Sequence, residues 1–446
     1  MRLRFPHPLV LLVACGALAA LGSWILPAGE FERRADAATG RDVVVAGTYH
    51  RVDPQPVNAF EAVVAIPRGI VDAASVIGFV FLVGGAFAIV EKTGALERVV
   101  NWLVAKLSRR SVLVIPICCI AFAAGGALMH MAEELIAFVP VLLLLVRRFG
   151  YTRVTAVAMS IGAAAVGAAF SPVDPFMVGI AQQVAGLPLL SGTNFRLIFL
   201  AIALAFWIFA LARYAEKNRL DPETSPVGSA THLELRHTVI LLLVIAAFAL
   251  LILGVNEWGW GFDELSAVFL TMGVVAGVIG GLRINGTAEA LVDGFRAMAY
   301  SALLIGFARA IYIVMDQGKI IDTVVHGVFV PIENLPVALS ATGMMVAQTL
   351  VHFAVPSTSG QAVLTLPVLV PLSDLIGLAR QVTVLAYQYG AGLCELLTPT
   401  NGALMAMLGA AGVSYGDWLR FFLPRYAVLL GVAVVALLIA ISIGLS

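Results

Sequence analysis

The sequence SPVDP at residues 171–175 interrupts an apolar run that extends from Val154 to Leu190. Two prolines beside a carboxylate cannot continue a helix, because proline lacks a backbone amide hydrogen and clashes with the preceding turn. The sequence TPTNG at residues 398–402 interrupts a second apolar run, from Val382 to Ala411. We therefore predict two helices, each broken near its centre.

The two interruptions lie 227 residues apart (398 − 171 = 227). The same offset relates four pairs of distinctive residues, which are Pro140 and Pro367, Gly150 and Gly377, Arg153 and Arg380, and Pro172 and Pro399. Four coincidences in one register predict two diverged copies of a single unit, and each copy would contain one broken helix.

The composition is that of a membrane protein. Of the 446 residues, 61% are hydrophobic and only 12% are charged, and the mean hydropathy is +0.98. Soluble domains contain about 25% charged residues. We therefore predict an all-α protein that crosses the lipid bilayer many times. The net charge is +0, so nothing indicates a nucleic-acid partner, and the four cysteines are interpreted as small core residues.

Two other apolar segments are too long for one span and carry polar residues near their centres. The segment 112–147 contains Glu133 and Glu134 and ends in arginines on both sides. Arginines mark the cytoplasmic side, so this segment is predicted to be a re-entrant hairpin with its tip at mid-membrane. The segment 336–376, with the tip PSTSG at 356–360, is predicted to be the second hairpin.

These features divide the chain into two repeats. The first repeat is 1–214, with its hairpin at 112–147 and its broken helix at 154–187; a cytoplasmic loop and linking span follow at 215–258; the second repeat is 259–446, with its hairpin at 336–376 and its broken helix at 379–412. The count is nine crossings and two hairpins. A single joining span would invert the second repeat, which places the N-terminus in the cytoplasm and the C-terminus in the periplasm.

Three local predictions complete the outline of the spans. The polar segment 214–236 is predicted to be a loop that links the halves, and 256–264 a loop on the outer side. An interfacial helix is expected at 289–298, followed by a separate span at 299–315.

Inverted repeats with broken helices are typical of secondary transporters. A broken helix exposes carbonyls, which suit a cation, and amides, which suit a carboxylate. The candidate binding residues at the breaks and the second tip are Ser171, Val173, Asp174, Ser357, Thr358, Ser359, Gly360, Glu395, Thr398, Thr400 and Asn401. Na⁺ could be held by Ser171, Thr398 and Asn401. The alternative is that the breaks are proline kinks packed by small residues.

Four acids fall near the predicted midplane: Glu133, Glu134, Asp174 and Glu395. An ionised group there costs at least ~2.5 kcal/mol, so it faces a cavity or a partner. Such a set favours a cation, a proton relay or a cationic substrate. The alternative is structural pairing, for instance with three secondary candidates: His130, His352 and Arg309. For Arg309, a counter-ion role is favoured over contact with a substrate carboxylate, and the histidines either titrate near neutral pH or are ordinary hydrogen-bonded residues.

No enzyme motif is present in the sequence. It contains no phosphate-binding Walker loop, no Gly-x-Ser-x-Gly sequence and no histidine pair at metal-binding spacing. We therefore expect neither a primary pump nor a membrane hydrolase, and no cofactor.

At HMAEE (130–134), SPVDP (171–175) and STSG (357–360) the sequence resembles the YfcC branch of the DcuC-like carriers, within the ion transporter superfamily. The resemblance implies a homodimer and an elevator mechanism, in which hairpins and broken helices move against a fixed scaffold. The segments 96–107 and 320–330 would be flat helices linking the two domains. The Ser-Asn-Thr signatures of dicarboxylate-carrying relatives are absent, and relatives of this branch are associated with basic amino acids.

The sequence thus predicts a secondary active transporter in a bacterial inner membrane. It would move an amino-acid-like solute, specifically a basic amino acid, by Na⁺ or H⁺ coupling or by exchange. The alternative within this class is a carrier for dicarboxylates or short-chain carboxylates. A channel and a non-transporting membrane scaffold are the alternatives from other classes.

Overall fold

The computed structural model describes residues 7–36, 41–96, 98, 113–222, 235–329, 331 and 336–445. The chain begins with the apolar helix α1 (Pro8–Ile25). Four short strands follow in two antiparallel pairs, β1 (Gly29–Glu30) with β4 (His50–Arg51) and β2 (Arg33–Asp36) with β3 (Arg41–Val44). Two helices then run almost without interruption, α2 (Ala59–Asp72) and α3 (Ala74–Lys92).

The segment predicted as the first hairpin consists of two helices with an irregular tip between them. Helix α5 (Val114–Met129) ends at His130, and a 3-10 helix, η2 (Glu133–Phe138), leads into α6 (Val139–Phe149). The predicted broken helix follows. Its first part comprises α7 (Arg153–Val157), the π-helical turn η3 (Ala158–Gly162) and α8 (Ala163–Ala169). Its second part comprises the π-helical turn η4 (Pro175–Gly179) and α9 (Ile180–Val184). The interruption at residues 170–174 confirms the predicted break.

Long helices connect the first half of the chain to the second. They are α10 (Thr193–Lys217), α11 (Leu235–Trp258), α12 (Phe262–Ile279) and α13 (Arg283–Gln317). The second helix–tip–helix unit follows a short helix and consists of α14 (Ile321–Phe329), α15 (Val337–Ala354) and α16 (Thr358–Leu375). The second broken helix and a final span are α17 (Arg380–Cys394), α18 (Gly402–Ala411) and α19 (Tyr415–Ser442).

The order of elements repeats, as the 227-residue offset indicated. In each half, two helices separated by a tip precede a broken helix, and one long helix follows. Gly150 and Gly377, which share that offset, both adopt φ = 71° at the turn before the broken helix. A side chain disfavours this left-handed conformation, which explains glycine at both positions.

Three local predictions from the sequence are wrong. The interfacial helix at 289–298 and the span at 299–315 form one helix, α13, of 35 residues. This stretch contains no proline, so nothing in its backbone forces the predicted boundary. The outer loop is shorter than 256–264, because α11 extends to Trp258 and α12 begins at Phe262. The linking loop is also shorter than 214–236, since α10 extends to Lys217 and α11 begins at Leu235. Of the two predicted flat helices, α14 is present, whereas nearly all of 96–107 lies outside the described residues.

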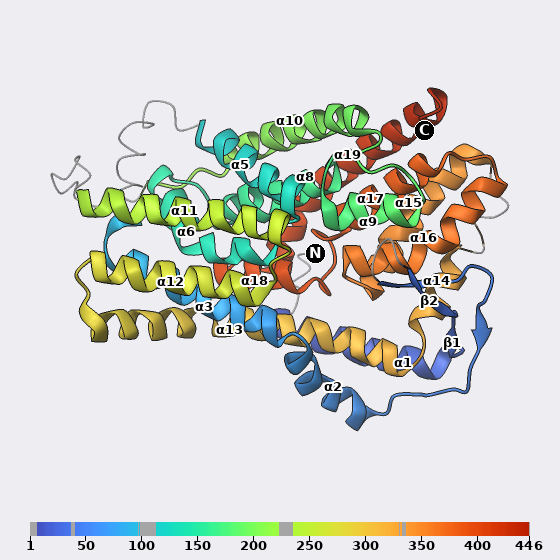
Figure 1. Ribbon diagram of the computed structural model, residues 1–446, viewed down its shortest axis with the longest axis horizontal. Helices are drawn as coiled ribbons and strands as arrows, with labels where there is room; N and C mark the ends of the chain where they lie inside the picture. The colour runs from blue at the N-terminus through green and yellow to red at the C-terminus, as the bar shows by residue number, and fades with distance from the viewer. Residues whose placement is uncertain are drawn as a thin grey trace.

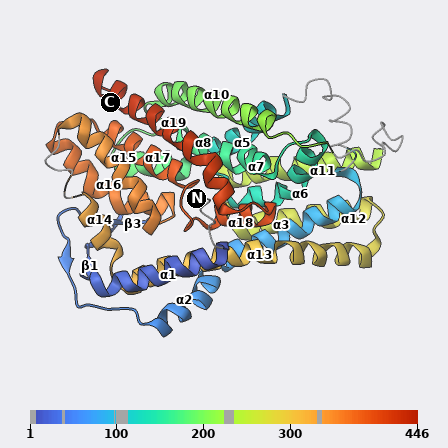
Figure 2. The same cartoon turned by 180° about the vertical axis from the view of Figure 1, so that it is seen from behind.

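The helices lie mainly along one long axis of the molecule (Figure 1). The long helix α13 runs beside α1, α3 and α12 on one side, whereas α8 and α17 lie nearer the centre, and Figure 2 shows the same arrangement from behind. Glycines allow the closest approaches. An added Cβ at Gly294 of α13 would lie 2.4 Å from the Cα of Gly85 in α3.

The broken helices are embedded in protein. Every residue of α17 after Arg380 is buried, as is every residue of α8. The guanidinium of Arg196, on α10, is fully buried and binds α17 through Gln388 (3.0 Å) and Gln381 (2.8 Å). It also donates to the backbone carbonyl of Ser191 (2.7 Å). Irregular backbone at membrane depth is tolerated where protein surrounds it, and these contacts supply that surrounding.

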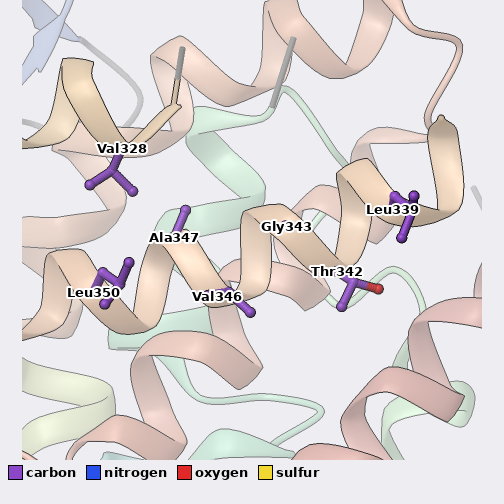
Figure 3. A pocket seen from close by; sticks show the side chains of 7 residues that line it. All are labelled: Val328, Leu339, Thr342, Gly343, Val346, Ala347 and Leu350. Carbon is purple, nitrogen blue, oxygen red and sulfur yellow. The ribbon is translucent and has the colours of Figure 1, made fainter. Parts of the chain in front are cut away.

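Six helices of the described chain are long and apolar enough to cross a membrane, namely α3, α10, α12, α13, α15 and α19. The surface of these helices is also apolar enough to face lipid. Figure 3 shows aliphatic side chains along one side of α15, with Val328 of α14 beside them, and Leu339, Val346 and Leu350 of this groove are more than half exposed. Exposed leucines and valines of this kind suit a hydrocarbon environment. The protein is a multi-pass membrane protein.

Candidate functional site

A cavity of about 570 Å³ lies where the two tips and the second break meet. Its polar and charged lining residues are Asp72, His130, Glu133, Glu134, Arg309, Ser357, Thr358, Ser359, Glu395, Thr400 and Asn401. Ten of these were singled out from the sequence, and Asp72 was not. The structure therefore brings together residues that lie up to 329 positions apart in the chain (401 − 72 = 329).

The first tip places two carboxylates on the cavity wall. Helix α5 ends at His130, whose backbone is left-handed, with φ 54° and ψ 41°. Glu133 and Glu134 then open the 3-10 helix η2, and Glu134 accepts a hydrogen bond from the amide of Ala132 (3.0 Å). A left-handed conformation costs a residue with a side chain roughly 1–2 kcal/mol. The contacts of the imidazole offset that cost.

The side chain of His130 joins both breaks and both tips. Its Nδ1 lies 2.7 Å from Oδ2 of Asp174 in the first break, and its Nε2 lies 3.1 Å from Oε1 of Glu395 in the second. The hydroxyl of Thr358, at the second tip, is 3.3 Å from the same Nε2. We call these four residues the His130 cluster. The sequence suggested His130 only as a secondary candidate, and the structure places it at the centre of the site.

The first break is stabilised by its own side chains. The Ser171 hydroxyl donates to the carbonyl of Ala127 (2.6 Å) and accepts from the amides of Val173 (3.0 Å) and Asp174 (2.8 Å). The carboxylate of Asp174 accepts from the amides of Phe176 (2.9 Å) and Met177 (3.1 Å), as a cap at a helix start does. Ser171, Val173 and Asp174 therefore lie behind the cavity wall, and they hold the break rather than line the cavity.

The second break uses the same chemistry. Asn401 caps α18 by accepting from the amide of Leu404 (3.0 Å), and the hydroxyls of Thr398 and Thr400 are 2.7 Å apart. Thr400 also donates to the carbonyl of Phe353 (3.1 Å). Thr400 and Asn401 reach the cavity, whereas Thr398 is fully buried behind it. The three oxygens suggested for Na⁺, on Ser171, Thr398 and Asn401, are thus already engaged within their own breaks.

The second tip presents a helix start to the cavity. The side chain of Ser357 caps α16 by accepting from the amide of Gly360 (3.3 Å), and the carbonyl of Thr358 accepts from the hydroxyl of Tyr387 (2.6 Å). Ser357, Thr358 and Ser359 line the cavity, and Gly360 lines a second one. The amides at a helix start carry partial positive charge, so this tip suits an anionic group.

Two secondary candidates behave differently from His130. His352 is fully buried and binds the side chain of Gln361 through Nδ1 (2.8 Å), and it does not line the cavity. Arg309 is a counter-ion, as favoured from the sequence, but its partner is Asp72 rather than one of the four midplane acids. Its guanidinium also lies over the ring of Tyr312, 4.6 Å from the centroid.

A second cavity, of about 470 Å³, lies beside the first, between the strands and α13. Arg309, Tyr312 and Ser357 line both cavities, so they form the wall between them. The remaining charged residues of the second cavity are Glu30, Arg33, Asp42, Asp316, Lys319 and Asp322. Two ion pairs connect the strand segment to the turn after α13 and to α14. They are Glu30 with Lys319 (2.8 Å) and Arg33 with Asp322 (2.9 Å).

We expect the Glu30–Lys319 ion pair to contribute little to the free energy of unfolding, and only over part of the pH range. The hydrogen bond from Lys319 lowers the pKa of Glu30, and Glu30 raises the pKa of Lys319. The stabilisation from Glu30 is therefore present above its ordinary pKa, about 4.3, and is lost as the pH falls through its lowered value. That from Lys319 is present below about 10.4 and is lost as the pH rises through its raised value.

Both partners are about one-third exposed (37% and 34%), so Glu30→Gln should cost less than ~1 kcal/mol at pH 7. The difference in unfolding temperature between the variant and the wild type should be smaller at pH 3, below the ordinary pKa of Glu30, than at pH 7. Thermal unfolding in detergent at both pH values checks this, with Glu32→Gln on the same exposed segment as the matched control. Equal destabilisation at pH 3 and pH 7 would mean that the carboxylate acts by packing rather than by charge.

The sequence did not reveal the aromatic part of the site. Phe176, Trp260, Phe262 and Tyr312 line the first cavity together with the acids. Trp260 lies in the segment 256–264, which was predicted only as a loop on the outer side. Its neighbour Trp258 lies 5.1 Å away between ring centroids, and only the folded arrangement turns Trp260 toward the cavity. Aromatic faces attract ammonium and guanidinium groups, so these rings suit a cationic ligand.

Comparison with known proteins decides the family. A profile of the DcuC family, described as "C4-dicarboxylate anaerobic carrier", matches residues 5–442. A relative from Escherichia coli strain K12, described as "Putative basic amino acid antiporter YfcC", is 33% identical over 470 residues, which cover 94% of this chain and 93% of the relative. The chain belongs to the DcuC family. The family is described as a carrier and the E. coli relative as an antiporter, and this DcuC-family protein is a membrane transporter.

More distant similarities were also found for this DcuC-family protein. An uncharacterised protein of Haemophilus influenzae is 27% identical, with 90% of this chain and 82% of that protein covered. Among solved structures, the YdaH transporter of Alcanivorax borkumensis is 16% identical with a TM-score of 0.45, covering 98% of this chain and 99% of that chain. MtrF of Neisseria gonorrhoeae is 17% identical with a TM-score of 0.43, covering 98% of this chain and 96% of that chain.

Proposed function

We propose that the protein is a secondary active transporter for a small amino-acid-like solute with a cationic side chain, a basic amino acid. The observation that carries this proposal is the charge of the first cavity. Glu133, Glu134 and Glu395 come from two separate segments and face one space. The guanidinium of Arg309, which lines the same cavity, is already paired with Asp72.

The two sides of the cavity would hold the two ends of such a solute. Its ammonium or guanidinium group would contact Glu133 and Glu134 at the first tip, with the rings of Trp260 and Tyr312 nearby. Its carboxylate would meet the amides at the start of α16, next to Ser357, where the helix dipole favours negative charge. A bipolar cavity of this kind would orient a zwitterion with an added positive charge.

The transport cycle belongs to the same proposal. The two tips and two broken helices would move together as an elevator domain against a scaffold that includes α3, α12 and α13, in a homodimer. The repeats would be inverted, with the N-terminus in the cytoplasm and the C-terminus in the periplasm of a bacterial inner membrane. Support comes from the repeated element order and from the arrangement of broken helices around one polar cavity.

The alternative is a carrier for dicarboxylates or short-chain carboxylates. The description of the family profile, a C4-dicarboxylate carrier, favours it. The cavity opposes it, because a dianion would lie beside three glutamates and find one arginine that is already paired. The 33% identity to the E. coli YfcC protein, with the description quoted above, also favours the basic amino acid.

Uptake into proteoliposomes distinguishes the two solutes. We expect saturable uptake of radiolabelled arginine, which unlabelled ornithine and lysine inhibit and a large excess of succinate does not. Liposomes without protein are the control for leakage. Saturable succinate uptake without arginine uptake would assign the carboxylate-carrier function instead, and a non-saturable conductance would indicate a channel.

A further inference from the structure

The hydrogen bonds of His130 need one more proton than a neutral imidazole and two ionised carboxylates supply. A neutral imidazole has one N–H donor and one acceptor nitrogen, and an ionised carboxylate only accepts. Both ring nitrogens of His130 nevertheless contact a carboxylate oxygen, at 2.7 Å on Asp174 and 3.1 Å on Glu395. With both carboxylates ionised and the ring neutral, one of these contacts would set two acceptors against each other. The cluster must therefore hold an additional proton.

The position of the additional proton follows from the other contacts of Asp174. The second oxygen of this carboxylate accepts from two backbone amides, those of Phe176 and Met177, which favours the ionised form. The Nδ1 of His130 is then a donor to Asp174, and its tautomer is fixed. The additional proton lies between Nε2 of His130 and Oε1 of Glu395, on the cavity side of the ring.

The charged groups around this proton determine which kind of ligand can replace it. Glu133 and Glu134, on the same tip as His130, line the same cavity, and so do Arg309 and its partner Asp72. His352 of α15 lies within electrostatic range of Glu395 from the buried side. The hydroxyl of Thr358 is the one uncharged partner, 3.3 Å from Nε2. A solute cation that reaches Glu395 would meet a carboxylate already neutralised by one positive charge.

We propose that the proton shared by His130 and Glu395 is the coupling ion of this transporter, and that the cationic group of the solute displaces it. This inference rests on the function proposed above. When the solute cation beside Glu133 and Glu134 also pairs with Glu395, the proton leaves Nε2 of His130 for the water of the cavity. The ring of His130 then stays bound to Asp174 in its neutral form. One positive charge enters the site and one leaves it. The protein would then exchange one proton for one monovalent cationic solute.

Proton movement during arginine uptake tests this directly. Full-length protein is reconstituted into liposomes that contain a trapped pH-sensitive dye, and arginine is added outside at equal internal and external pH. Wild-type vesicles should become alkaline inside, because protons leave as arginine enters, at about one proton per arginine. Arginine uptake without any internal pH change would overturn the inference while leaving the proposed function in place. Absence of arginine/arginine exchange would overturn both.

The variant His130→Gln tests whether the exchanged proton is the one bound at His130. The amide of glutamine can still donate to Asp174 but cannot carry the additional proton, so the proton flux per transported arginine should fall at least tenfold, even though the rate of arginine transport falls as well. His50→Gln, at an exposed histidine of β4, is the matched control and should keep the wild-type ratio. A wild-type proton ratio in His130→Gln would contradict the assignment. If this variant fails to fold, Glu395→Gln tests the same proton from the other side, and the wild-type measurement stands without either variant.

Discussion

Glu133→Gln and Glu134→Gln should each reduce arginine uptake at least about tenfold. Glutamine keeps the size of the side chain and its acceptor oxygen but removes the charge that faces the cavity. Hydrogen bonds to charged groups contribute about 1.5–3 kcal/mol, and each 1.4 kcal/mol is roughly a tenfold change in affinity. The loss should appear as a higher KM for arginine in proteoliposome uptake, and the double variant should be inactive at micromolar arginine.

The matched control for this prediction is Glu91→Gln. Glu91 lies near the end of α3, is exposed, and does not line either cavity. It should keep the wild-type KM. Thermal unfolding of each variant confirms that it is folded before uptake is compared. Wild-type arginine uptake in a folded Glu133→Gln/Glu134→Gln double variant would remove the first tip from the binding site.

Gly126→Ala and Gly167→Ala should be strongly destabilising, because in each case the added methyl group would meet backbone atoms of another helix. A Cβ at Gly126 would lie 2.0 Å from the carbonyl oxygen of Ala164, and one at Gly167 would lie 2.1 Å from that of Ala123. Backbone atoms cannot move aside as flexible side chains can, so α5 and α8 must separate. Overpacking of this kind costs typically 1–3 kcal/mol, occasionally more.

The separation of α5 from α8 should also impair transport. Helix α5 carries His130 at its end, and the chain passes from α8 into the first break and Asp174. Moving the two helices apart lengthens the 2.7 Å contact between His130 and Asp174. We therefore expect a lower unfolding temperature together with reduced uptake per folded molecule, measured by thermal unfolding in detergent and by proteoliposome assay.

Gly431→Ala in α19 is the matched control. An added Cβ there meets nothing within 4 Å. Replacing an unhindered helical glycine by alanine stabilises by about 0.4–1 kcal/mol, so this variant should unfold at or above the wild-type temperature. If Gly126→Ala unfolds at the same temperature as Gly431→Ala, the close packing of α5 on α8 is not present in the membrane protein.

Much of the fold could be predicted because breaks in membrane helices need special residues. Proline beside polar side chains located both interruptions, at 171–175 and 398–402, and the shared offset located the two helix–tip–helix units. The boundary between 289–298 and 299–315 was wrong because it was transferred from the first half, by interpreting the charged stretch 289–298 as the repeat of an interfacial helix there. Charged side chains on a long helix can extend into solvent or toward partners, as Arg309 does with Asp72, without ending the helix.

The site was predicted in its residue types but not in its geometry. Acids and hydroxyls near the tips were recognised because ionisable groups are costly in a membrane. Which of them face the cavity depends on capping. The hydroxyl of Ser171 turns back to its own backbone, whereas Ser357 both caps α16 and reaches the cavity. The central role of His130 was not visible, because its partners lie 44, 228 and 265 residues away in sequence.

The most direct test of a cation-selective site shared by both halves is ligand-dependent thermal unfolding of the purified protein. A ligand at about 100 times its Kd stabilises the folded state by about 2.7 kcal/mol. Arginine at such a concentration should therefore raise the unfolding temperature of the wild type by several degrees. It should not raise that of the Glu133→Gln/Glu134→Gln double variant. Succinate should change the unfolding temperature of neither protein. Stabilisation by succinate without stabilisation by arginine, or an equal arginine shift in both proteins, would contradict the account.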